Sequence, residues 1–130
     1  MPLVMATCME VMDRPWEWGA ADCCTAACDV FLRLYGVDPM AQFRGRYSSR
    51  VGALRIIAQA GGFIDLAQGF ARSSGLVASD GRVGDFGVIL TGDEMAFGIR
   101  TEFGWVGKSE GGLAVVPNFK DAWACHQSSR

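Results

Sequence analysis

The chain has 130 residues, of which half are hydrophobic and one fifth are charged. This length and composition suit one hydrophobic core, so we expect a single domain over residues 1–130. The net charge is −2 and the arginines are scattered along the sequence, so the chain lacks the basic patch that holds a phosphate backbone. We therefore expect no nucleic-acid partner.

The N-terminal segment is predicted to form a helix over residues 2–12, which ends at the turn Asp13-Arg14-Pro15. Its apolar residues follow no basic leader, and Glu10 interrupts them before they reach a length that spans a membrane. We therefore expect neither a signal peptide nor insertion into a membrane.

A second helix is predicted from Asp22, which is an N-cap residue type, to Tyr35, with Gly36 as its end. It carries three of the five cysteines, Cys23, Cys24 and Cys28. Cysteines on one helix do not suit a disulfide, so we expect reduced thiols in a protein made in a cytoplasm. The chain has no paired Cys-x-x-Cys segments, so we expect no metal or other cofactor, and cysteines that pack as small apolar groups.

A loop and two more helices complete the predicted helical half, about residues 1–72. The loop Phe43-Arg44-Gly45-Arg46-Tyr47 either binds a partner, because arginine and tyrosine are enriched at interfaces, or forms an internal brace in which an arginine pairs with a carboxylate. A helix capped by Ser48 or Ser49 extends to residue 60, with Val51 and Leu54 at helical spacing. A brief helix covers residues 63–70.

The strand half, about residues 82–117, consists of short β-rich runs separated by glycine. We expect an antiparallel meander of the strands Phe86–Thr91, Met95–Thr101, Phe103–Lys108 and Leu113–Val116. After Pro117, Asn118 can cap a short helix to Trp123, and a polar tail completes the segment 118–130. The predicted fold class is α+β, with N-terminal helices packed on a small antiparallel sheet.

The start of the second helix is the place where chemistry is expected. A thiol there, such as Cys23, is readily converted to a nucleophilic thiolate. Hydrolysis of an amide also needs a proton donor, and the only histidine in the sequence is His126. His126 either folds back from the tail as a base or is an exposed tail residue. Trp16 and Trp18 either form a cleft rim that holds a peptide or glycan, or cover the core.

The segment Trp18-Gly19-Ala20-Ala21-Asp22-Cys23 resembles the aromatic-Gly-x-x-Asp-Cys motif of NlpC/P60-type cysteine peptidases, and Val83–Leu90 resembles their first core strand. The resemblance implies a minimal papain-like fold with Cys23 as the nucleophile. In that family the next strand begins with histidine, whereas this chain has Ala96, whose methyl group cannot carry a proton. The candidates for a third polar residue are Thr101, Glu102 and Lys108.

A narrower resemblance covers nearly the whole chain. The segments 15–24, 36–39, 44–47 and 60–62 resemble the DUF6950 family of small phage and prophage proteins, which are typically encoded among tail genes. This implies a pseudoenzyme that acts as a structural or interaction component of a phage tail, at the tail tip of the virion, with other tail-tip or hub proteins as partners. The alternative is an active cysteine peptidase in which Cys23 cleaves peptide amides of peptidoglycan; a third is a non-viral cytoplasmic thiol protein.

Overall fold

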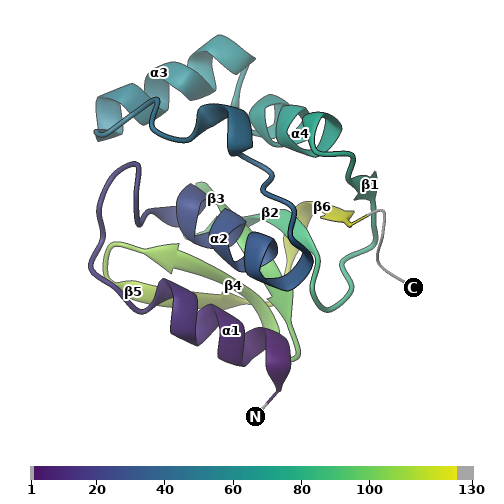
Figure 1. Cartoon of the computed structure of the whole chain (residues 1–130). Helices are drawn as coiled ribbons and strands as arrows, with labels where there is room; N and C mark the ends of the chain where they lie inside the picture. Colours follow the sequence, from purple (N-terminus) through teal and green to yellow (C-terminus); the bar gives the residue numbers. More distant parts are fainter. Residues whose placement is uncertain (1, 126–130) are drawn as a thin grey trace.

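The computed structural model describes residues 2–125, which form four α-helices, one 3₁₀ helix and a six-stranded antiparallel sheet (Figure 1). The helices are α1 (Leu3–Met12), α2 (Cys23–Tyr35), η1 (Ala41–Phe43), α3 (Arg50–Ala60) and α4 (Phe63–Ser73). The strands are β1 (Val77–Ala78), β2 (Phe86–Thr91), β3 (Glu94–Thr101), β4 (Gly104–Ser109), β5 (Gly112–Val116) and β6 (Phe119–Ala124). The predicted α+β class is confirmed.

The strands lie in the order β1-β6-β2-β3-β4-β5. From β2 to β5 the sheet is the predicted meander, and each of its three turns has two residues. The paired residues that flank these turns are Thr91 and Glu94, Thr101 and Gly104, and Ser109 and Gly112. The β2–β3 and β4–β5 turns therefore lie at the same end of the sheet. This is the end at which the candidate site is found.

The C-terminal segment is a strand, so the predicted helix from Asn118 to Trp123 is wrong. β6 lies within the sheet between β1 and β2, with Trp123 opposite Phe86. Lysine, aspartate and alanine in this segment allow a helix. In the sheet, however, the segment pairs with β2, and its residues Ala122, Trp123 and Ala124 are buried. The two-residue strand β1, which no pattern in the sequence indicated, pairs with β6.

The core lies between one face of the sheet and the helices α1, α2 and α4. A row of buried phenylalanine rings connects these layers. The ring centroid of Phe86 lies 5.9 Å from that of Phe31 of α2 and 5.1 Å from that of Phe97. The centroid of Phe97 lies 5.3 Å from that of Phe70 of α4. All five cysteines are free thiols, and three of them are buried in the core: Cys8, Cys28 and Cys125. No helix within residues 2–125 is long and apolar enough to cross a membrane.

α3 is packed differently from the other helices. It begins after Ser49, whose hydroxyl accepts a hydrogen bond from the backbone N–H of Gly52, as one of the two predicted caps. None of its residues is buried, and Val51 and Leu54, which set the predicted periodicity, are 64% and 49% exposed. In Figure 1, α3 lies at the margin of the molecule, beyond α2 and next to α4.

Candidate functional site

A cavity of about 660 Å³ lies at the N-terminus of α2, and we call it the α2 cavity. Its buried lining is mostly apolar, namely Met40, Leu66, Phe70, Ala96 and Phe97, and also includes the charged residues Asp22 and Lys108. α3 contributes one side through Leu54 and Ile57, among others. The loop before α2 contributes Trp16 and Trp18, and the two turns at the end of the sheet contribute Glu94 and Glu110.

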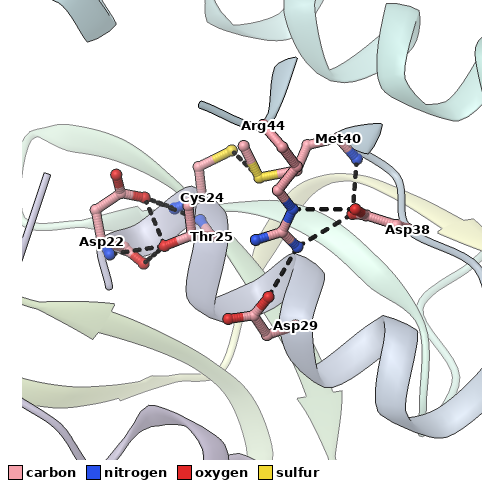
Figure 2. Close-up of polar contacts among 7 residues, drawn as sticks. All are labelled: Asp22, Cys24, Thr25, Asp29, Asp38, Met40 and Arg44. Atoms are coloured by element: carbon pink, nitrogen blue, oxygen red, sulfur yellow. Dashed lines mark hydrogen bonds and ion pairs between the residues drawn. The ribbon is translucent and has the colours of Figure 1, made fainter. Parts of the chain in front are cut away.

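Asp22 fixes the N-terminus of α2. It is 1% exposed, and its Oδ1 accepts hydrogen bonds from the backbone N–H groups of Cys24 and Thr25, each at 2.9 Å (Figure 2). Its Oδ2 accepts from the N–H of Gly19 at 2.8 Å and from the hydroxyl of Tyr47 at 2.6 Å. This carboxylate therefore joins the helix, the loop before it and the loop 43–47, and its buried charge is well compensated.

Gly19 is required by a close approach of two backbone segments. It has a φ of 85°, and a Cβ at this position would lie 2.2 Å from the carbonyl oxygen of Tyr47. Only glycine fits both conditions. The Gly-x-x-Asp part of the motif thus has a structural explanation: Gly19 allows the approach and Asp22 caps the helix, whether or not a reaction takes place.

Cys23 is partly exposed and lines the α2 cavity at the first turn of α2. The pKa of its thiol is raised to about 12, mainly by burial and in addition by the neighbouring Cys24 and Asp22. Hydrogen bonding from the backbone of Phe97 lowers the pKa, but by less. The thiol is therefore protonated at neutral pH, which is the unreactive state.

The position expected to hold a histidine contains a buried methyl group. Ala96 is 5% exposed and belongs to a cluster with Ile89, Trp105 and Ala122, against which Cys23 packs. His126, the candidate base, lies outside the described residues. Ala96 can therefore neither donate nor accept a proton at the position where the resemblance calls for a histidine.

The three candidates for the third polar residue, which would orient an imidazole, are engaged elsewhere. The Thr101 hydroxyl donates to the carbonyl oxygen of Gly104 at 2.8 Å, within the β3–β4 turn. The Glu102 carboxylate accepts from the first N–H groups of α1, each at 3.0 Å. Lys108 lines the cavity, but its Nζ donates to the carbonyl oxygens of Met12 and Arg14. Glu102 thus holds the start of α1, Lys108 holds the end of α1 and the loop after it, and Thr101 holds the β3–β4 turn.

Cys24 lies beside other sulfur atoms. Its Sγ lies 3.7 Å from Met40 Sδ (Figure 2). A hydrogen bond with Cys28 is the main cause that raises the pKa of Cys24, followed by burial. Residues 2–125 contain no group of three histidine, cysteine or acidic side chains arranged to hold a metal ion.

The loop 43–47 contains the internal brace that was one of its two interpretations. Arg44 pairs with Asp29 of α2 at 2.8 Å and with Asp38 at 3.0 Å, so it ties the loop to the helix (Figure 2). Phe43 lines the α2 cavity. Arg46 is exposed, with its guanidinium 5.6 Å from the centre of the Phe43 ring.

Trp16 and Trp18 form an edge-to-face pair, with ring centroids 5.0 Å apart, and both line the α2 cavity. They lie beside the N-terminus of α2 and also line the cavity. This is the place that both interpretations describe, a rim of the cleft and a cover over the core. The indole Nε1 of Trp16 is buried and has no hydrogen-bond acceptor among the described residues. Such a buried donor is costly to leave unpaired.

Sequence reasoning missed the contribution of α3 and of the two turns. One signal was present: the apolar residues of Arg50–Ala60 extend beyond the single stripe of a helix packed on a core, to positions 53 and 56 as well as 51, 54 and 57. Glu94 and Glu110 carry no such signal, because only the pairing of the strands brings the two turns to the same end of the sheet.

The comparisons with known proteins identify the family. The model of a domain of unknown function, DUF6950, matches residues 2–125, so the chain belongs to the DUF6950 family. No curated protein and no solved structure matches the chain.

Proposed function

We propose that this member of the DUF6950 family is an interaction component of a phage or phage-like tail, at the tail tip, built on a degenerate NlpC/P60-like fold. In this proposal the α2 cavity serves docking and not hydrolysis. The observation that carries it is the environment of Cys23, a thiol whose pKa is raised to about 12 and which packs against the cluster that contains Ala96. A cysteine peptidase needs both a thiolate and a proton carrier.

The arrangement of elements supports the fold part of the proposal. A cysteine at the N-terminus of α2 lies against an antiparallel sheet, and Ala96 of β3 lines the same cavity, at the position where the resemblance calls for a histidine. The tail location depends on the resemblance to proteins encoded among phage tail genes. The partners in this proposal are other tail-tip or hub proteins.

An active peptidoglycan peptidase is the second candidate. It is favoured by one observation, that Cys23 lines an open cavity next to Trp16 and Trp18. In this alternative, His126 or a residue of another protein supplies the proton. The two candidates differ in the reactivity of one thiol, which makes them separable.

Alkylation of Cys23 by iodoacetamide tests the proposal. With a pKa of about 12, the thiolate fraction at pH 8 is about 10⁻⁴, compared with about one quarter for an unperturbed thiol. We expect the folded chain to react at least about a hundredfold more slowly at Cys23 than the same chain unfolded in urea. Peptide mapping by mass spectrometry measures this, and Cys23→Ser identifies the labelled peptide.

Fast, stoichiometric labelling of Cys23 at pH 6, together with release of peptides from purified peptidoglycan, would overturn the docking proposal in favour of the peptidase. A functional readout complements the chemistry. In a phage that lacks its own copy of the gene, Cys23→Ala should restore infectious particles as well as the parent chain does. A folded Cys23→Ala chain that assembles into non-infectious particles would show that the thiol is needed.

A further inference from the structure

The α2 cavity has an apolar interior and carboxylates at its edge. The interior is formed by side chains such as Met40, Phe70 and Phe97, and by Leu54 of α3. The edge carries Glu94 of the β2–β3 turn and Glu110 of the β4–β5 turn, both of which are exposed.

These edge charges are not neutralised by the described part of the chain. The ion pairs among residues 2–125 involve Glu10, Asp29, Asp38 and Asp80, and neither Glu94 nor Glu110. The lining has two cationic side chains. Lys108 is buried and directed to backbone carbonyl oxygens, which leaves Arg50 as the exposed cation of the lining.

Trp16 and Trp18 add aromatic surface to the same cavity, as an edge-to-face pair with ring centroids 5.0 Å apart. The cavity therefore combines apolar surface, part of it aromatic, with exposed carboxylates.

We propose that the α2 cavity binds a peptide segment of a partner protein that is apolar in its centre and flanked by lysine or arginine. This inference depends on the docking function proposed above and specifies the partner. Burial of exposed apolar surface on α3 and in the cavity stabilises the complex, at about 25 cal/mol per Å². The carboxylates attract a basic flank and repel an acidic one.

The same charges select against other occupants. A second copy of this chain has a net charge of −2 and presents the same acidic edge, so like charges meet if two cavities face each other. An anionic lipid surface and a nucleic acid are repelled for the same reason. A basic, apolar protein segment is the partner chemistry that fits both the apolar lining and the carboxylates.

Binding of synthetic peptides to the full-length chain tests this inference. The probe is a fluorescein-labelled peptide of about 12 leucines and lysines with an amphipathic pattern, measured by fluorescence anisotropy. Two matched peptides replace lysine by glutamate, or leucine by serine. We expect each replacement to weaken binding at least about tenfold, and the leucine–lysine peptide to lose affinity when NaCl is raised from about 50 to about 300 mM.

Variants of the chain locate the binding. Glu94→Gln with Glu110→Gln should weaken binding of the leucine–lysine peptide by about three- to tenfold, and Leu54→Ser by about tenfold. Both changes are at exposed positions, and circular dichroism checks that the fold is kept. Glu10→Gln on α1 removes an exposed carboxylate, paired with Arg33, outside the cavity lining, so it should leave binding unchanged.

The outcomes separate the two proposals. Equal binding of the lysine and glutamate peptides, or equal losses in Glu10→Gln and in the double variant, would overturn the inference of a basic partner. Absence of binding by every peptide would overturn it as well, even if Cys23 reacts as slowly as the docking function requires. Fast alkylation of Cys23 with wall-peptide release would overturn the docking function itself, whatever the peptides do.

Discussion

α2 and α3 have the same local signals and opposite environments. Each begins at an N-cap side chain, Asp22 or Ser49, and each ends at a glycine in the left-handed conformation, Gly36 or Gly61. α2 nevertheless buries six residues, whereas α3 buries none. The comparison teaches that caps and helical spacing determine where a helix forms, while tertiary packing determines whether it supports the core or offers a surface.

Truncation of one large side chain on each helix is the most direct way to break this comparison. Phe31→Ala removes a fully buried ring from α2, and we expect it to lower the free energy of unfolding by about 3–5 kcal/mol. Leu54→Ala on α3, where the side chain is 49% exposed, should cost less than about 1 kcal/mol. Urea denaturation followed by circular dichroism measures both. A loss at Leu54 as large as that at Phe31 would show that α3 belongs to the core.

Two glycines sharpen the comparison at the two ends of α2. Both have positive φ, 85° at Gly19 and 73° at Gly36, so alanine is strained at each by about 1–2 kcal/mol. Only at Gly19 does the new Cβ meet another atom, the Tyr47 carbonyl oxygen at 2.2 Å; at Gly36 nothing lies within 4 Å.

We therefore expect Gly19→Ala to destabilise the protein by about 3 kcal/mol or more, and Gly36→Ala by the conformational cost alone. The midpoint of urea denaturation distinguishes them. Similar midpoints for the two variants would mean that the loop before α2 moves freely relative to residue 47, which contradicts the close approach described above.

Whether an element could be predicted from the sequence depends on how far apart in the chain the residues that stabilise it lie. The four helices and the meander were predictable, because capping residues, periodicity and two-residue turns act over a few residues. The segment Phe119–Ala124 was not, because its pairing partners in β2 lie 30 to 37 positions away and override a local N-cap signal at Asn118.

The candidate site divides in the same way. The motif around Cys23 and Asp22 could be recognised in the sequence, and so could the alanine at position 96. The cavity itself could not, since it arises where α3, two turns and the loop before α2 meet in space. The structural roles of Gly19 and Asp22 depend on Tyr47, which lies 25 residues after Asp22 in the chain.

The two N-caps allow the last and smallest test of the comparison. Ser49 is exposed and accepts one hydrogen bond, so Ser49→Ala should cost about 1 kcal/mol or less. Asp22 is buried and accepts from Gly19, Cys24, Thr25 and Tyr47, so its replacement by alanine leaves several donors unpaired. We expect Asp22→Ala to cost about 2–3 kcal/mol.

A double-mutant cycle separates capping from bracing at this carboxylate. If Asp22 also holds loop 43–47, Asp22→Asn and Tyr47→Phe should destabilise the chain non-additively, with a coupling of about 1 kcal/mol or more in urea denaturation. Ser49→Ala combined with Tyr47→Phe is the control, and its coupling should be smaller because no hydrogen bond joins the two side chains in the described structure. Additivity in both pairs would reduce Asp22 to a simple cap, like Ser49, and remove the difference between the starts of α2 and α3.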